Sequence, residues 1–112
     1  MNNRLLSLLG LARRCGKLAA GFDAAVESAA DGEARLILVA WDAAARTQRN
    51  IRQEAERYGV TVLPVQESKD EIGKAIGAAS TGIVSIRDAG FAAKIRQLAA
   101  DTAGQKFQNG ED

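Results

Sequence analysis

The residues best suited to chemistry lie near the start of the chain, in residues 5–23, which read LLSLLGLARRCGKLAAGFD. Arg13, Arg14 and Lys17 surround Gly16, and a second glycine, Gly21, precedes a segment with helical periodicity. The N-terminus of a helix carries free N–H groups and a partial positive charge, so both features suit a bound anion such as a phosphate. The stretch therefore predicts an anion-binding site made of basic side chains and of a helix N-terminus that a glycine precedes.

Catalytic chemistry has little support in this sequence. The chain has no histidine, which is the commonest general base and metal ligand, and only one cysteine. Catalytic Ser-His-Asp and Cys-His arrangements and the usual structural zinc sites are therefore excluded. Residues 10–17, GLARRCGK, resemble a phosphate-binding loop, but five residues separate the glycines instead of four, and Leu18 replaces the metal-binding hydroxyl. We therefore expect that this protein is not an enzyme and that it has no catalytic residue, no metal site and no cofactor.

Five further side chains leave alternatives open. Cys15 could be a reactive thiol or a small apolar residue that faces inward, and the apolar interpretation is favoured. Trp41, which directly follows a strand pattern, could stack on a nucleic-acid base or pack partly buried against the core. Arg46, Arg49 and Arg52 could form a second basic surface or simply a solvated helix face.

The composition indicates one small domain with an aliphatic core. The chain has 112 residues, of which 46% are hydrophobic and only 4% aromatic. A chain of this length buries roughly two-thirds of its unfolded surface, which is enough for a real core. The formal net charge is +1, yet residues 1–21 hold four basic and no acidic side chains, and residues 22–34 hold four acidic and no basic ones. This separation favours a local basic surface or simply solvated helix faces.

The expected location is the cytoplasm. A single cysteine allows no intramolecular disulfide, which suits a reducing compartment. The N-terminal leucine run is interrupted by arginines too early for a signal peptide, and no apolar run approaches the roughly 18 residues that span a bilayer.

The elements that must position these residues alternate between helix and strand along the whole chain. Helices are expected over residues 3–14, 22–30, 44–58, 69–76 and 89–102, and strands over residues 17–20, 35–40, 60–65 and 82–86. Residues 35–40 are apolar on both faces, so they should lie inside a covered sheet. Ser68 and Glu71 form a capping-box pattern. The sequence predicts an α/β fold, a three-layer α/β/α sandwich with a mixed sheet of about four strands. One domain is expected over residues 1–103, and residues 104–112 are expected to be a disordered tail.

Four segments resemble a known family, the ribosomal protein L7Ae family in its bacterial form, whose members are related to kink-turn RNA-binding proteins. These segments are LLGLARRCGKLAAG, RLILVAWDA, SKDEIGKAIG and SIRDAGFAAKI. The resemblance runs from about Leu5 to Ile95. It implies an α/β/α sandwich that binds RNA, such as a kink-turn or another structured or ribosomal RNA, without catalysis.

The resemblance also implies where the RNA lies. The expected contacts come from the glycine-led start of the second helix, from the loop over residues 77–82, and from the lysine that begins the short helix. The basic residues before the second helix would extend this surface. The expected RNA-binding residues are Arg13, Arg14, Lys17, Gly21, Phe22, Asp23, Ala24, Lys69, Ala78, Ala79 and Ser80.

The chain departs from the family pattern in its second helix. Members of the family usually open this helix with Asn-Glu or Lys-Gln, and this chain has Asp23 and Ala24. Glu27 and Asp31 stand where a lysine and an arginine are common, and acidic side chains oppose phosphate binding. The alternative is therefore a protein-interaction module on the same fold that has lost the standard kink-turn site.

Overall fold

The computed structural model describes the backbone of residues 3–111 and the side chains of residues 4–100. Helices and strands alternate in this part of the chain, as the periodicity predicts. Their order is α1 (Asn3–Arg14), β1 (Leu18–Ala20), α2 (Phe22–Ala30), β2 (Leu36–Ala40), α3 (Ala45–Tyr58), β3 (Val62–Val65), α4 (Lys69–Ala75), β4 (Ile83–Ile86) and α5 (Ala89–Glu111).

The strands form one mixed sheet in the order β1-β4-β2-β3. β1 and β2 both run antiparallel to β4, whereas β2 and β3 are parallel. All five residues of β2 are buried, so the apolar pattern of this segment is that of an interior strand. Pro64 lies in β3, which is an edge strand of the sheet. Proline has no backbone N–H, and an edge strand tolerates this because no further strand pairs with its outer side.

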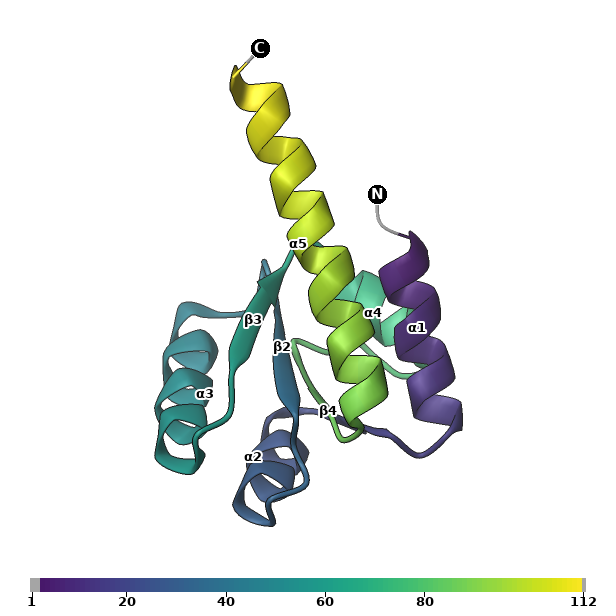
Figure 1. Cartoon of the computed structure of the whole chain (residues 1–112). Coiled ribbons are helices and arrows are strands. Elements are labelled where there is room, and N and C mark those ends of the chain that lie inside the picture. The colour runs from purple at the N-terminus through teal and green to yellow at the C-terminus, as the bar shows by residue number, and fades with distance from the viewer. Residues whose placement is uncertain (1–2, 112) are drawn as a thin grey trace.

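Two helical layers cover the sheet, and Figure 1 shows α2 and α3 on one face with α1, α4 and α5 on the other. Successive residues of β2 point to opposite faces. Leu38 packs in the core under α1, α4 and α5, whereas Ile37 and Val39 pack in the core under α2 and α3. The predicted three-layer α/β/α sandwich on a four-stranded mixed sheet is confirmed.

The starts of α4 and α5 follow from their capping residues. The hydroxyl of Ser68 accepts from the N–H of Glu71 at 3.1 Å, and the carboxylate of Glu71 accepts from the N–H of Ser68 at 2.9 Å. This reciprocal pair is the expected capping box of α4. The carboxylate of Asp88 accepts from the N–H of Phe91 at 2.9 Å and so begins α5.

The backbone of α5 continues to Glu111, so the expected end near residue 102 is too early. Residues 101–111 are described only as backbone, and Asp112 lies outside the described residues. The division into a domain over residues 1–103 and a disordered tail over 104–112 stays a prediction. Among the residues that the structure describes, no helix combines the length and apolar character needed to cross a membrane.

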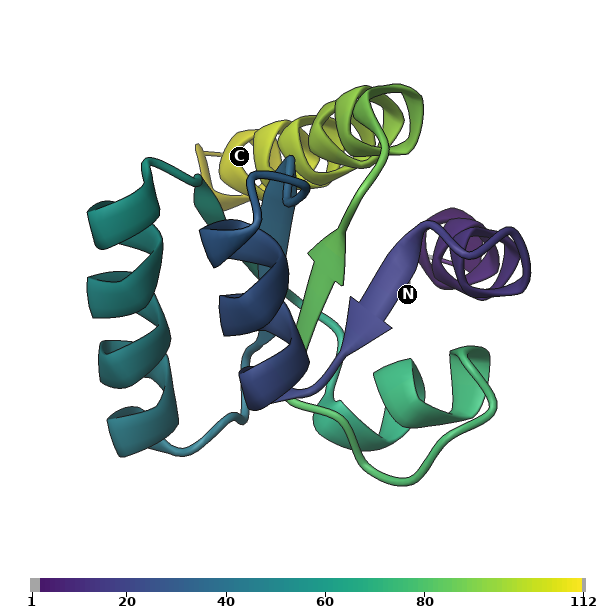
Figure 2. The ribbon, with the colours of Figure 1, turned by 90° about the horizontal axis from the view of Figure 1, so that it is seen from below.

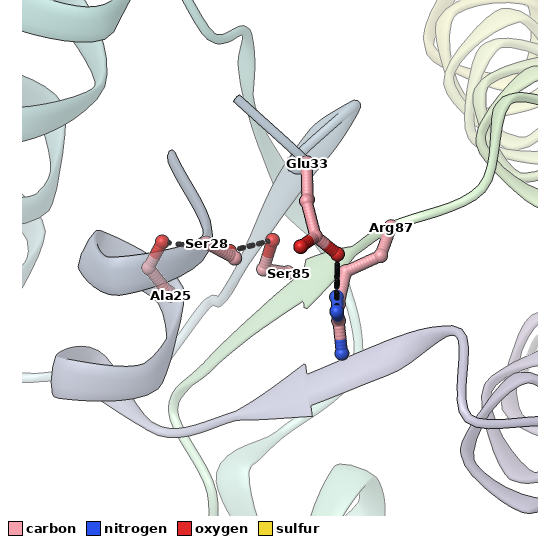
Figure 3. Close-up of polar contacts among 5 residues, drawn as sticks. All are labelled: Ala25, Ser28, Glu33, Ser85 and Arg87. Atoms are coloured by element: carbon pink, nitrogen blue, oxygen red, sulfur yellow. Dashed lines mark hydrogen bonds and ion pairs between the residues drawn. The ribbon is translucent and has the colours of Figure 1, made fainter. Parts of the chain in front are cut away.

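Polar contacts fix α2 against β4, as Figure 3 shows. The buried hydroxyl of Ser28 lies 2.9 Å from the carbonyl oxygen of Ala25 and 2.7 Å from the hydroxyl of Ser85. Nearby, the guanidinium of Arg87, which follows β4, forms an ion pair with Glu33. These contacts hold the helix that Gly21 opens in a fixed position on the sheet.

Candidate functional site

A groove of about 840 Å³ runs beside the edge strand β1, and we call it the β1 groove. It collects residues from the end of α1, from β1, from the starts of α2, α3 and α4, and from the segment between α4 and β4. In Figure 2 the start of α2 and the α4–β4 segment lie together at the lower edge of the view. The groove is lined by Arg13, Gly16, Leu18, Ala19, Ala20, Gly21, Phe22, Ala43, Ala44, Thr47, Lys69, Ala78, Ala79, Ser80, Thr81, Gly82, Ile83 and Arg87.

Two helix N-termini open on the β1 groove without a side-chain cap. Gly21 precedes α2, and Ala44 precedes α3, and neither residue can accept a hydrogen bond through its side chain. Gly21 has φ 99°, a backbone conformation that favours glycine, and its N–H donates to the carbonyl oxygen of Ile83 at 2.8 Å. The first N–H groups of both helices are therefore open to an external acceptor, and their dipoles favour an anion.

The third helix start at the groove is already satisfied from within the chain. In α4 the first N–H groups bond to Asp42 and Ser68, at 2.8 Å from Lys69 and 3.1 Å from Glu71. The start of α4 therefore contributes the side chain of Lys69 to the groove, and the starts of α2 and α3 contribute backbone donors.

Among the residues whose side chains the structure describes, all the ionisable ones that line the β1 groove are basic: Arg13, Lys69 and Arg87. Arg87 is paired with Glu33, but neither Arg13 nor Lys69 forms an ion pair with a described residue. Arg13 is exposed, and Lys69 is half-buried. The groove thus combines two unpaired cations, one paired cation and two open helix starts, and this arrangement suits a phosphate.

The α4–β4 segment folds back onto α4 and forms one wall of the groove. The N–H of Ala78 donates to the carbonyl oxygen of Gly73 at 2.8 Å, and the N–H of Thr81 donates to that of Lys69 at 3.0 Å. The hydroxyl of Thr81 donates to the carbonyl oxygen of Ala79 at 2.8 Å. These bonds leave Ala78, Ala79 and Ser80 exposed, so this wall offers small side chains and accessible backbone.

Seven of the eleven predicted site residues meet in the β1 groove. They are Arg13, Gly21, Phe22, Lys69, Ala78, Ala79 and Ser80.

The other four do not line the groove. Lys17 and Asp23 are exposed outside it. Arg14 lines a separate hollow between α1 and α4, with a guanidinium nitrogen near Gly10. Ala24 lines another hollow, and a role for these four residues in binding stays a prediction.

The hollow that contains Ala24 is acidic, and we call it the acidic hollow. It has a volume of about 220 Å³ and is lined by Ala19, Ala24, Glu27, Ser28, Asp31, Glu33 and Arg87. The two acidic residues that depart from the family pattern thus lie outside the β1 groove. Arg87 borders both sites, and its ion pair with Glu33 lies between the basic and the acidic surface.

Sequence reasoning missed one cation and the whole contribution of α3. Arg87, Ala44 and Thr47 line the groove, and nothing in their local sequence marks them. Their positions depend on the strand order β1-β4-β2-β3, which places Arg87 at the end of β4 beside β1 and separates the start of α3, after β2, from β1 by one strand. To find these residues from the sequence, the order of the strands in the sheet would have had to be predicted.

Cys15 and Trp41, whose roles the sequence left open, are both exposed. Cys15 lies in the turn after α1 and is exposed, so the expectation of an inward-facing residue is wrong. The turn, and not a helix face, determines its direction: its N–H still donates to Leu11, but Gly16 follows with φ 72°. Trp41 is 65% exposed, so its packing interpretation is also wrong, and stacking on a base stays a prediction.

Comparisons with known proteins show the family to which this chain is similar. The ribosomal protein L7Ae/L30e/S12e/Gadd45 family matches residues 3–96. The chain is 33% identical over 91 residues to the RNA-binding protein YlxQ of Bacillus subtilis (strain 168), a match that covers 81% of this chain and 90% of that protein. It is 30% identical over 95 residues to the RNA-binding protein YlxQ of Enterococcus faecium, covering 85% of this chain and 90% of that protein.

Solved structures give the same fold. A protein of unknown function from Bacillus halodurans C superposes with a TM-score of 0.81 at 29% identity, covering 88% of this chain and 99% of the other. The Giardia lamblia 15.5kD RNA binding protein superposes with a TM-score of 0.68 at 20% identity, covering 93% and 92%, and supports the fold alone. The family match includes every strand and most of the helical residues, and the chain therefore belongs to the ribosomal protein L7Ae/L30e/S12e/Gadd45 family.

Proposed function

We propose that this protein binds RNA without catalysis and recognises a kink-turn or another irregular duplex through the β1 groove. The observation that carries this proposal is the convergence of two uncapped helix starts with Arg13, Lys69 and Arg87, and no acidic side chain, in one groove. Phosphate contacts supply much of the affinity of nucleic-acid binding, and both N–H groups and basic side chains make them.

The small residues of the groove support an irregular RNA over a regular duplex. Ala78, Ala79 and Ser80 form a wall without bulky side chains, so the backbone of an RNA can approach closely. Single-stranded or kinked nucleotides expose base edges and phosphates that such a surface can follow by shape. Ala78, Ala79 and Ser80 would then pack on a nucleotide extruded from the duplex.

The two YlxQ relatives are named as RNA-binding proteins, and this supports the same ligand here. The lack of histidine in the sequence supports binding without catalysis. We also propose that the protein works in the cytoplasm, where structured RNA is available and its single cysteine would stay reduced.

The test is a binding titration against a kink-turn RNA and a matched duplex without the kink, at two salt concentrations. Tight binding that requires the kink is expected, with an affinity that falls as salt rises. Weak binding that is equal for both RNAs, and that moderate salt abolishes, would refute recognition of the kink.

A second function is favoured by the acidic hollow. Glu27, Asp31 and Glu33 present three carboxylates beside the basic groove, and adjacent surfaces of opposite sign suit a protein partner with complementary charges. In this alternative the protein is an interaction module that has lost the standard kink-turn site. A pull-down separates the two functions, because nuclease treatment releases partners held through RNA and leaves partners held directly.

A further inference from the structure

Trp41 is the most exposed of the large hydrophobic side chains in the described part of the chain, at 65%. It directly follows β2, whose five residues are all buried. Tryptophan is highly buried on average, and its ring can bury a large area. An exposed tryptophan next to the most buried strand therefore leaves a large apolar surface available to a ligand.

The backbone that carries Trp41 is fixed on both sides. Its own N–H donates to the carbonyl oxygen of Glu67 at 3.3 Å, and the N–H of Ala43 donates to that of Ala40 at 3.1 Å. Asp42, between them, accepts from the N–H of Lys69 at 2.8 Å. The ring is therefore presented from an ordered turn, and a ligand that binds it has only the side-chain torsions to immobilise.

The same turn forms part of the β1 groove. Ala43 and Ala44 line the groove, and Lys69, which is bonded to Asp42, lines it as well. Trp41 itself does not line the groove. It is thus one residue from a direct hydrogen bond to the start of α4, at the end of the sheet where Lys69 and the start of α2 lie. Arg87, which follows β4, lies at the opposite end of the sheet.

We propose that Trp41 is an additional RNA contact, on which an unpaired base next to the groove-bound nucleotides stacks. This inference rests on the proposed function. It adds a contact to a base, whereas the basic side chains and helix N-termini of the groove would bind phosphates. Base–aromatic stacking tolerates any base, because every base has a π face. Trp41 would therefore add affinity for RNA with an unpaired nucleotide, with little sequence preference.

A base fits this ring better than a protein partner does. Protein interfaces bury contiguous apolar patches, whereas one ring is enough to stack a base. The other large hydrophobic side chains that the described residues expose are Leu11 in α1 and Tyr58 at the far end of α3. Trp41 lies shortly before the start of α3, and Tyr58 is the last residue of that helix. A helix of 14 residues is about 20 Å long, so Tyr58 lies far from Trp41.

The sequence contains one tryptophan, so tryptophan fluorescence, excited where tyrosine does not absorb, reports on Trp41 alone. We expect a kink-turn RNA with an unpaired nucleotide to change this fluorescence and to protect the ring from acrylamide. Trp41→Ala should weaken binding by about 5- to 150-fold, the range for loss of one stacked base, without changing the dependence of affinity on salt. Trp41→Phe should keep most of the affinity, and Tyr58→Ala should leave it unchanged.

The outcomes separate this inference from the function on which it rests. If the wild-type protein binds the kink-turn RNA but Trp41→Ala binds equally well, the stacking contact is refuted and the proposed function stands. If Trp41→Ala lowers affinity and also lowers the salt slope, its effect acts through phosphate contacts and the inference is wrong. If the wild-type protein binds no RNA, both are wrong, and protection of Trp41 by a nuclease-resistant protein partner would identify the ring as part of a protein interface.

Discussion

The backbone N–H of Lys69 donates a 2.8 Å hydrogen bond to the carboxylate of Asp42, joining the first residue of α4 to the turn after β2. The aliphatic part of the Lys69 side chain then passes over Gly82, where an added Cβ would lie 3.6 Å from Cγ and Cδ of the lysine. Two contacts thus hold Lys69 at the rim of the β1 groove. The packed fold therefore determines the position of this half-buried residue.

Removal of the Asp42 carboxylate should therefore lower both the stability of the fold and the affinity of the β1 groove for RNA. Asp42→Ala leaves the first N–H of α4 without its acceptor, and loss of a comparable helix cap costs about 1 kcal/mol. We expect the free energy of unfolding, measured by urea denaturation, to fall by about that amount, and RNA affinity to fall as well. Asp70→Ala is the matched control, because Asp70 is an exposed acidic residue in the same helical turn. Equal stability of Asp42→Ala and wild type would contradict the capping role.

Lys69 should contribute to RNA affinity chiefly through its charge. Lys69→Ala removes a groove cation that forms no ion pair with any described residue. The slope of log affinity against log salt should fall by about one, with weaker binding to every RNA that occupies the groove. Lys94→Ala, which removes an exposed lysine from α5, serves as the control and should leave the slope unchanged. An unchanged slope for Lys69→Ala would remove this residue from the proposed site.

The fold was predictable because its signals are local. The apolar run of residues 35–40 indicated a buried strand, and Ser68 and Glu71 indicated a capping box. Each of these signals depends on a few neighbouring residues and on backbone chemistry. The element boundaries in the structure differ from the predicted ones by at most two residues, except at the end of α5.

The site was only partly predictable because it is assembled from distant segments. Gly21 was found from its own sequence context, since it stands at a helix start, and Lys69 was found through the resemblance to the family. Arg87 and Thr47 were missed, because their place in the groove depends on the position of β4 between β1 and β2. Arg13 and Arg14 are adjacent in sequence, yet a helix turns successive residues by about 100°, so only Arg13 lines the groove.

The groove wall formed by residues 78–80 depends on a close approach at Gly73. A Cβ added there would lie 2.1 Å from the carbonyl oxygen of Ala79, a backbone atom that must move. Gly73→Ala should therefore displace this wall and weaken RNA binding, and it should lower the free energy of unfolding by about 1–3 kcal/mol. Gly10→Ala is the matched control in α1, where the nearest atom is the carbonyl oxygen of Ala75 at 2.8 Å.

We expect Gly10→Ala to cost less stability than Gly73→Ala and to leave RNA affinity close to that of wild type. Its contact lies between α1 and α4 and does not involve the residues of the groove wall. Urea denaturation measures the first difference, and an RNA titration measures the second. Full RNA affinity in a folded Gly73→Ala variant would show that the wall does not contact RNA.

Glu67, in the segment between β3 and α4, is a buried residue whose burial disfavours the ionised form of its carboxyl. It is only 4% exposed, and this burial raises the pKa of its carboxyl above the ordinary value of 4.5, with the nearby charge of Glu71 adding to the increase. The folded state therefore binds the proton of Glu67 more tightly than the unfolded state does. The contribution of Glu67 to stability is most favourable below pH 4.5 and is lost as the pH rises through its raised pKa.

Glu67→Gln should consequently be more stable than wild type at pH 7, because the amide removes the buried charge while keeping the size of the side chain. The difference should shrink as the pH falls toward 4, where the wild-type carboxyl becomes protonated and resembles the amide. Thermal denaturation of both proteins across this pH range measures the effect, and Glu56→Gln, at an exposed position in α3, should show no comparable gain at pH 7. A lower stability of Glu67→Gln at pH 7 would mean that the ionised carboxylate is stabilised by a partner stronger than its burial penalty.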